Sequence, residues 1–269
     1  MGETVGSSAP APGAAAEPWD ADISHDGLRL DPLGPSDRAL LAGDPIEVAP
    51  ALIGLVLVSR TSDGAMTAGR IVEVEAYRGV HDPASHAYRG PSARNRTMFG
   101  RAGLLYVYLS YGMHHCCNVV CEEEGVAGAV LLRALEPLAG LREMHRRRAA
   151  RRRSDRRPLR DTELCSGPGR LCAALGIGRS HDGADLLAPV SQVRLARLRT
   201  AEAAPGTSAT DRSAVTEPGH GPRLEADGLP LALARGPRVG ISPAGATASE
   251  PWRWWLAGNS HVSRVKGTG

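Results

Sequence analysis

Three apolar runs between Gly103 and Pro137 follow one another too closely for any helix to fit between them. Residues 110–113 join the first two runs and residues 122–125 join the last two, and both joins have the length and composition of turns. Parallel neighbours need a crossover of a dozen or more residues, usually a helix. The spacing therefore argues against a doubly wound parallel sheet. We expect an α+β fold, a single mixed domain built on a curved, largely antiparallel sheet.

Segments of biased composition set the limits of that domain. Residues 1–26 are rich in small side chains, lack the basic start and apolar run of a secretory signal, and are expected to form a disordered tail. We expect the domain to cover residues 27–266, with a flexible Arg-rich segment at 146–160 and an inserted surface loop at 201–228. No run of about twenty apolar residues occurs, so no membrane span is expected.

The basic residues are almost all arginines, and Lys266 is the only lysine. Ten arginines fall within residues 142–160, although the formal net charge of the chain is only +3. Such a run could line a phosphate backbone, or it could be a solvated helix face or a mobile loop. We favour a solvated face or loop over a phosphate-binding role. The five cysteines are odd in number and lack Cys-x-x-Cys spacing. We expect neither disulfides nor structural zinc, and reduced thiols in a cytosolic protein.

Aromatic residues are concentrated in one part of the chain. All five tyrosines and the single phenylalanine lie between Tyr77 and Tyr111. Flat rings near basic residues suit a base-stacking pocket, but a local aromatic core fits the clustering equally well. Tyr111 precedes Gly112 at the expected hairpin tip, where it could lie over its own hairpin or act as a wedge between stacked bases.

Residues 70–77 alternate, which predicts a half-buried strand with Val72 and Val74 on the core side. Glu73 and Glu75 then share the other face with Tyr77. A carboxylate beside such rings would be a stronger base and could activate water, but spacing alone does not choose between the two glutamates.

Two polar residues interrupt apolar strands. Arg133 lies within residues 129–135, where an unpaired guanidinium would be costly, so we expect it to meet an acid or a phosphate. Asn118 lies in a second apolar run, and its position alone favours a hydrogen-bonded core amide over a ligand-binding role.

Taken together in order, several segments resemble the alkyladenine (3-methyladenine) DNA glycosylase family. They are Ile71-Val-Glu-Val-Glu-Ala-Tyr-Arg-Gly79, Asp82-Pro-Ala-Ser-His86, Arg94-Asn-Arg-Thr-Met-Phe99, Leu105-Tyr-Val-Tyr-Leu-Ser-Tyr-Gly-Met113, Asn118, Leu131-Leu-Arg-Ala-Leu-Glu-Pro137 and Leu164-Cys-Ser-Gly-Pro168. Each is weakly specific alone, whereas the ordered set is highly specific. The likeness extends over about residues 36–200 and 236–265.

The resemblance implies a fold similar to the C-terminal domain of methionyl-tRNA formyltransferases. It implies that Glu75 is the general base and that Arg133 lies beside the attacking water and the target phosphate. The remaining implied roles are stacking of the flipped base between Tyr77 on one side and His86 and Tyr108 on the other, intercalation by Tyr111 with Met113 beside it, and exclusion of the guanine 2-amino group by Asn118.

The resemblance also implies the activity. We expect removal of an alkylated or deaminated purine, such as 3-methyladenine, 7-methylguanine or hypoxanthine, from damaged double-stranded DNA, without metal or cofactor. Lyase activity requires an amine that forms a Schiff base, and Lys266 and the N-terminal amine are the only candidates, so we expect a monofunctional enzyme. We further expect a monomer in the bacterial cytoplasm, with the nucleus not excluded. The alternatives are a glycan hydrolase with two carboxylates and a non-catalytic binder of distorted DNA.

Overall fold

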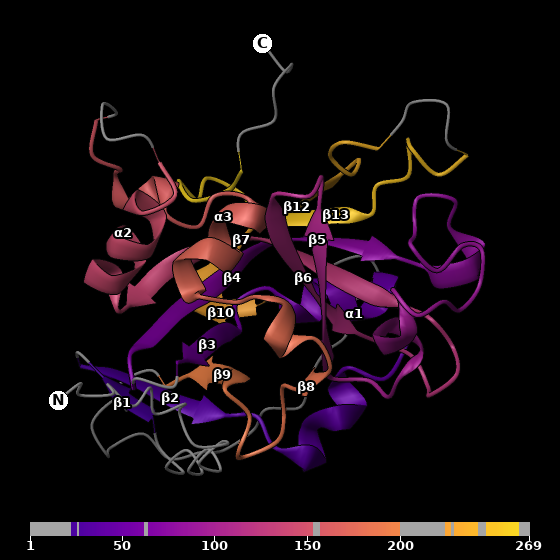
Figure 1. Ribbon diagram of the computed structural model, residues 1–269, viewed down its shortest axis with the longest axis horizontal. Helices are drawn as coiled ribbons and strands as arrows, with labels where there is room; N and C mark the ends of the chain where they lie inside the picture. Colours follow the sequence, from indigo (N-terminus) through magenta and orange to yellow (C-terminus); the bar gives the residue numbers. More distant parts are fainter. Residues whose placement is uncertain are drawn as a thin grey trace, which may run out of the picture.

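The computed structural model describes residues 23–25, 27–61, 64–152, 157–199, 224–226, 229–241 and 246–263 (Figure 1). Its strands are β1 (Ile23–His25), β2 (Leu28–Pro32), β3 (Val56–Arg60), β4 (Met66–Tyr77), β5 (Leu104–Ser110), β6 (His114–Val120), β7 (Ala129–Ala139), β8 (Ala184–Asp185), β9 (Val193–Leu198), β10 (Leu224–Ala226), β11 (Leu229–Leu231), β12 (Leu233–Gly236) and β13 (Arg253–Leu256). The α-helices are α1 (Pro45–Leu52), α2 (Leu141–Ala149) and α3 (Pro168–Leu175). Short 3-10 helices are η1 (Pro35–Leu40), η2 (Gly79–His81), η3 (Arg96–Phe99), η4 (Asp161–Glu163) and η5 (Arg179–His181).

One curled sheet dominates the described residues, in the order β1-β2-β9-β3-β4-β7-β6-β5-β8, with β13 and β12 added beside β4. Every strand pairing in it is antiparallel, which confirms the predicted mixed fold with an antiparallel sheet. The likeness to formyltransferase C-terminal domains stays a prediction. Among the described residues, no helix combines the length and apolar character needed to cross a bilayer.

Strand β4 is the centre of this sheet. It pairs with β7 along one edge, and with β3 and then β13 along the other. The sequence predicted a half-buried β4, with the face that carries Glu73 and Glu75 exposed. That prediction was wrong, because both glutamates are as fully buried as Val72 and Val74. Glu73 is enclosed by Arg253 of the neighbouring strand β13 and by Ser263, and Glu75 by the Val239 amide. Alternation within 70–77 carries no information about such distant segments.

A pair of bulges interrupts the β4–β7 ladder next to the two glutamates. Ile71 pairs with Leu135 and Val74 with Leu132, but Glu73 pairs with Ala134. Val72 on β4 and Arg133 on β7 are therefore extra residues without a partner in the register. Bulges often re-aim a side chain next to an active site. Here the bulge occurs at the residue whose guanidinium reaches both glutamates.

Helices α1 and α3 are flanked by residues that local chemistry favours at helix ends. Asp44 caps α1 through its side chain, which accepts a hydrogen bond from the Ile46 amide at 2.9 Å, and Pro45 occupies the first turn. Helix α3 begins at Pro168 and ends at Leu175, and it is followed by Gly176, whose φ of 71° suits glycine. Helix α1 packs on β4 and β7, whereas α3 packs on β6, β7 and α2 (Figure 1).

All five cysteines are free and buried. Burial raises the pKa of Cys116 to about 11 and that of Cys165 to about 12, and it raises the pKa of Cys121 and Cys172 further. These thiols therefore stay protonated at neutral pH and pack as small apolar side chains.

The predicted segment boundaries meet the structure only in part. Ile23–His25 form β1, which pairs with β2, so the structure differs from a tail that runs to residue 26. Residues 146–149 belong to α2, and 153–156 of the Arg-rich segment lie outside the described residues. Most of the predicted insertion at 201–228 also lies outside them, apart from β10, which forms a two-stranded sheet with β11.

Candidate active site

Two buried glutamates and one buried arginine meet between β4 and β7. The Nε of Arg133 lies 2.8 Å from Glu73 Oε1, and its Nη1 lies 3.2 Å from Glu75 Oε1. The Arg133 side chain is 8% exposed and both glutamates are fully buried. The expectation that Arg133 would meet an acid is confirmed, and it meets two.

Glu73 is the more extensively bound of the two carboxylates. Arg253 Nε lies 2.7 Å from its Oε1, while Ser263 donates from its amide at 2.7 Å and from its hydroxyl at 2.8 Å. Burial alone would raise the pKa of Glu73, but Arg133, Arg253 and the two Ser263 hydrogen bonds outweigh it and hold this pKa below its usual value. Glu73 is therefore a fixed structural anion and a poor proton acceptor.

Glu75 is held by fewer charges. Its carboxylate accepts a hydrogen bond from the Val239 amide at 2.6 Å and one from the Tyr77 hydroxyl at 3.1 Å. Burial raises the pKa of Glu75 and outweighs the opposing effects of Arg133, the Val239 amide and the Tyr77 hydroxyl. The side chain is thus a stronger base than an ordinary glutamate, which is the property that general-base catalysis requires.

A small cavity of about 80 Å³ adjoins Glu75 through Tyr77, and aromatic rings form its walls. Its lining comprises Tyr77, His86, Tyr106, Tyr108 and Asn118, together with Ala84, Ser85 and Met98. The Asn118 amide donates to the Tyr106 carbonyl at 3.2 Å, so Asn118 is both a bonded buried amide and part of the wall. A slot between rings with one amide at its edge suits a flat heterocycle.

The rings of this cavity support one another. His86 meets Tyr108 edge-on with ring centroids 4.4 Å apart, and its Nδ1 lies 3.1 Å from the Tyr106 hydroxyl oxygen. Burial, aided by the charge of Arg94, lowers the pKa of His86 and keeps its imidazole neutral at neutral pH. Burial also raises the pKa of Tyr106 to about 12 and that of Tyr108 further. The cavity is therefore lined by uncharged, electron-rich rings.

Arg238 supports Tyr77 on the face of its ring. Its guanidinium carbon lies 4.6 Å from the Tyr77 ring centroid, and the guanidinium is paired with buried Asp82 and with Thr247. Because Val239 follows directly, one short segment holds both Tyr77 and Glu75. The sequence predicted no role in the site for Arg238 and Val239, because a hydrogen bond from a backbone amide cannot be recognised in the residue pattern.

The β5–β6 hairpin places Tyr111 far outside any core. Its side chain is 89% exposed and that of Met113 is 69% exposed. Tyr111 and Gly112 have φ values of 48° and 67°, and the Met113 amide donates to the Ser110 carbonyl at 3.0 Å. This is a type I′ turn, in which Asn, Asp or Gly is favoured at the position that Tyr111 occupies. An exposed ring held in a disfavoured conformation points to a role outside the protein.

The structure brings together most of the residues that the sequence singled out. Glu75, Arg133 and Tyr77 are in contact, and His86, Tyr108 and Asn118 line the adjoining cavity. Tyr111 and Met113 lie on the hairpin tip and not in that lining. The roles assigned to them remain predictions. Tyr106 was missed as a wall residue, although its place in the tyrosine cluster carried the signal.

Comparison with known proteins gives a consistent result. The family model for methylpurine-DNA glycosylase matches residues 39–260. A protein of Burkholderia cenocepacia, provisionally named 3-methyladenine DNA glycosylase, is 44% identical over 226 residues, which cover 84% of this chain and 89% of that one. Proteins with the same provisional name from Leifsonia xyli and Streptomyces avermitilis are 44% and 40% identical, covering 86% and 85% of this chain and 92% and 91% of their own. The chain belongs to the methylpurine-DNA glycosylase family.

Proposed function

We propose that this DNA glycosylase takes an alkylated or deaminated purine out of duplex DNA and hydrolyses its N-glycosidic bond with a water activated by Glu75. The observation that carries the proposal is the position of Glu75. It is a buried carboxylate of raised pKa that contacts Arg133 on one side and, through the Tyr77 hydroxyl, adjoins a ring-lined cavity on the other. A base in that cavity would place its sugar next to this carboxylate.

The chemistry follows from that placement. As the bond between the base and C1′ breaks, its electron pair leaves with the base and C1′ becomes electron-poor. The Glu75 carboxylate stabilises this developing positive charge and accepts a proton from the water that attacks C1′. The products are the free base and an abasic sugar. A purine alkylated at N3 or N7 is already cationic, so the departing electron pair neutralises it and no strong acid is required.

The cavity supports selection of such a base. Eversion costs a few kcal/mol and costs least for a poorly paired lesion. In our proposal Tyr77 stacks on one side of the everted base, with His86 and Tyr108 on the other, and a cationic base gains from electron-rich rings. Asn118 occupies the wall where a guanine 2-amino group would require space. Tyr111, with Met113 beside it, fills the gap that the base leaves in the duplex.

The direct test is base release. The protein would be incubated with duplexes that carry a single 3-methyladenine, 7-methylguanine, hypoxanthine or ethenoadenine, and abasic sites would be scored by alkaline cleavage. We expect alkali-dependent strand breaks at one or more lesions and none in undamaged duplex. Binding to these duplexes without base release would instead favour a non-catalytic binder of distorted DNA.

The same assay tests whether the enzyme is monofunctional. The described residues contain no lysine, and Lys266 lies outside them. Without a Schiff base, strands should break only after alkali, and borohydride should trap no covalent adduct. A trapped adduct would contradict this part of the proposal.

The raised pKa of Glu75 predicts the acid side of the pH profile. A general base must be ionised, so the single-turnover rate should fall as pH drops through the pKa of Glu75, which lies above the usual 4.5. Tyr77→Phe removes a hydroxyl that stabilises the carboxylate and should move the midpoint further upward. Rates measured from pH 4 to 8 on a cationic lesion would check this. A midpoint at or below 4.5, or a downward shift in the variant, would contradict it.

Replacement of Tyr111 should change protein stability and the rate of base release in opposite directions. Tyr111→Asn should stabilise the protein by about 1 kcal/mol, because Asn tolerates the positive φ and the exposed ring contributes no burial. It should also slow base release at limiting enzyme about ten- to a hundredfold, since a stacked ring contributes about 1–3 kcal/mol. Tyr111→Phe keeps the ring and should keep the rate. Thermal unfolding and single-turnover rates would be measured together. An undiminished rate in Tyr111→Asn would contradict the proposal that Tyr111 fills the gap left by the everted base.

A further inference from the structure

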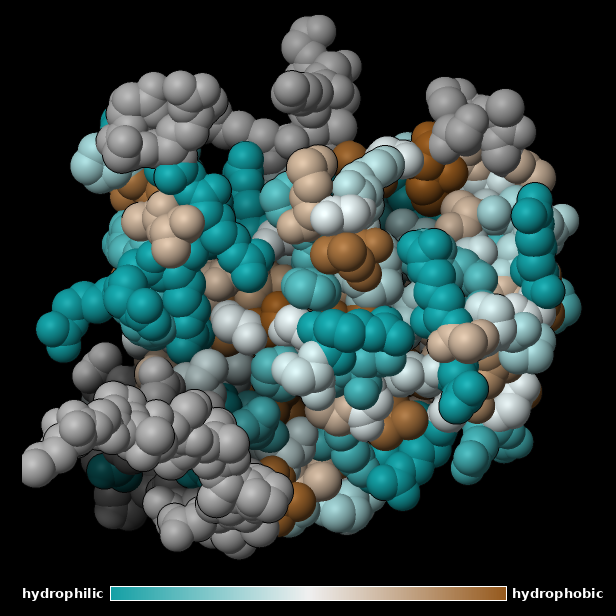
Figure 2. Space-filling model, viewed as in Figure 1, coloured by the Kyte–Doolittle hydropathy of each residue, from teal (hydrophilic) through white to brown (hydrophobic). Residues whose placement is uncertain are grey.

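A second and much larger cavity, of about 740 Å³, opens on the other side of the candidate active site. Arg133 and Ser263 form one end of its lining, so the Glu75–Arg133 pair lies between this cavity and the ring-lined one. We call it the arginine basin, after the six further arginines in its lining: Arg148, Arg151, Arg152, Arg157, Arg160 and Arg170. Figure 2 shows hydrophilic side chains over α2, the helix beside the basin.

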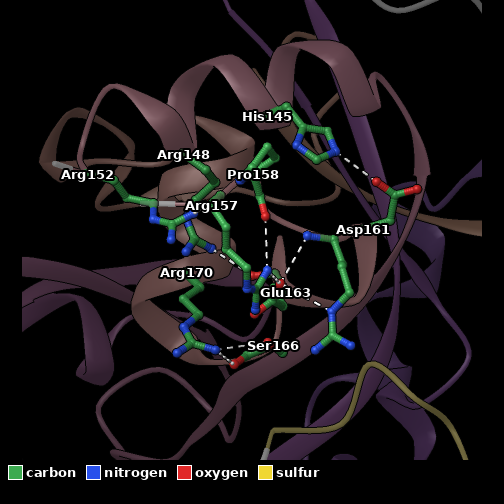
Figure 3. A network of polar contacts seen from close by, with 10 residues as sticks. His145, Arg148, Arg152, Arg157, Pro158, Asp161, Glu163, Ser166 and Arg170 are labelled. Atoms are coloured by element: carbon green, nitrogen blue, oxygen red, sulfur yellow. Dashed lines mark hydrogen bonds and ion pairs between the residues drawn. The ribbon is translucent and has the colours of Figure 1, made fainter. Parts of the chain in front are cut away.

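The charge of the basin is largely uncompensated by the described residues. Glu163 is the single carboxylate in its lining, and it pairs with Arg157 and Arg160. Within the described part of the chain, Arg152 and Arg170 bind only oxygens of Arg157 and Ser166, and Arg151 contacts no carboxylate there. In Figure 3, Arg148, Arg152, Arg157 and Arg170 gather on one side of Glu163. A concave site with this excess of positive charge attracts an anion.

The basin is built and not merely a charged surface. Arg148 is only 9% exposed and donates to the carbonyls of Glu163 and Leu164, which ties α2 to the segment before α3. Burial, together with the charges of Arg170 and Arg152, lowers the pKa of Arg148. The expectation of a solvated face or mobile loop was therefore wrong for this residue. A fixed guanidinium kept among other guanidiniums is costly unless a ligand offsets the repulsion.

The basin also borders the hairpin that carries Tyr111. His114, at the start of β6, lines it, and a side chain at Gly169 would place its Cβ 2.9 Å from the Cβ of His114. The first turn of α3 thus packs directly against the β6 residue that follows the turn carrying Tyr111. Helix α3 begins there without a side-chain cap, so its first amides add positive potential to the same space.

We propose that the arginine basin binds consecutive phosphodiester groups of the DNA strand that carries the everted nucleotide. The proposal rests on the function proposed above. A base in the ring-lined cavity and a sugar at Glu75 leave the adjoining backbone on the Arg133 side, where the basin begins. Guanidiniums suit this task, because each presents paired donors to phosphate oxygens. A free phosphate or nucleotide has the same chemistry and is the competing occupant.

The test is the salt dependence of DNA binding by a variant carrying Arg151→Gln, Arg152→Gln and Arg170→Gln, the three arginines without a carboxylate partner in the described residues. Each phosphate contact contributes about 0.9 to the slope of log K against log salt, so the slope should fall by up to about three. Affinity at 0.1 M salt should fall by roughly a hundredfold or more, equally for lesion and undamaged duplexes.

The matched control removes the same charge from the far edge of the sheet. Arg29→Gln, Arg197→Gln and Arg199→Gln lie on or next to β2 and β9 and should leave slope and affinity unchanged. A basin variant with the wild-type slope would overturn the proposal. If that variant lost binding of inorganic phosphate, measured at constant ionic strength, while its DNA slope stayed unchanged, the free anion would be the occupant. Absence of base release by the wild-type protein would contradict the proposed function but not the basin.

Discussion

Glu75→Gln is expected to slow single-turnover base release by about 10²–10⁴-fold, the usual contribution of a general base, while the protein stays folded and binds lesion DNA. Glutamine keeps one acceptor oxygen, which suits the Val239 amide, and its NH2 group can donate to the Tyr77 hydroxyl oxygen, but it takes no proton from water. Single-turnover rates at saturating enzyme would isolate the chemical step, because affinity is measured separately.

The stability of the same variant is informative. Because the pKa of Glu75 is raised in the folded protein, this group stabilises the fold only below its unfolded pKa, and that contribution is lost as pH rises through the folded pKa. At neutral pH its ionised form therefore costs stability, and Glu75→Gln should melt at the wild-type temperature or above. Active sites commonly show this opposition between stability and activity. A variant that lost activity because it unfolded would not support the assignment.

Glu73→Gln should do the opposite and lower the free energy of unfolding by about 3–5 kcal/mol at neutral pH. Arg253 would lose its carboxylate partner, and Arg133 would lose one of two, while both remain buried. The pKa of Glu73 is lowered in the folded protein, so its contribution is present above the unfolded pKa and is lost as pH falls through the folded pKa. The difference from wild type, measured by denaturant unfolding, should therefore shrink in acid.

A double variant tests whether the stability loss of Glu73→Gln comes from the unpaired charge and not from disrupted packing. Glu73→Gln combined with Arg253→Leu removes a charge from each side and should recover part of the lost stability. The pair of glutamate variants also tests the choice between them. If Glu73→Gln folded normally and lost base release while Glu75→Gln retained it, the catalytic assignment would have to be exchanged.

The local patterns predicted the fold class because antiparallel strands with short turns leave few alternatives. The runs around residues 103–137 became β5, β6 and β7. Asp44 caps the start of α1 and Gly176 follows the end of α3, as their chemistry predicts. The alternation of β4 predicted that Glu73 and Glu75 lie together, and both contact Arg133, but Ile71, predicted on the same face, lies in one core cluster with Val72 and Val74. It gave the wrong exposure, because burial of Glu73 and Glu75 depends on β13 and Val239, more than 150 residues away.

The candidate site was predictable to the extent that its residues are unusual where they stand. An arginine in an apolar strand and five tyrosines in one stretch are signals that a sequence carries. The choice of Glu75 over Glu73 came from family resemblance, and the structure supplies a physical reason for it in the unequal number of charges around the two carboxylates. Arg238 was not singled out, and the arginine run of 142–160 was interpreted as a solvated face or loop, because the roles of these residues depend on contacts between distant segments.

The packing of the cysteines has a consequence for the conditions in which such an enzyme works. The reagents that methylate purines are electrophiles, and a thiolate is the side chain that reacts with them most readily. All five cysteines are buried, and Cys116, Cys121, Cys165 and Cys172 stay in the less reactive protonated form. The protein therefore exposes little thiolate to alkylating reagents. We therefore expect the cysteines of this protein to stay largely unmodified under conditions that alkylate DNA.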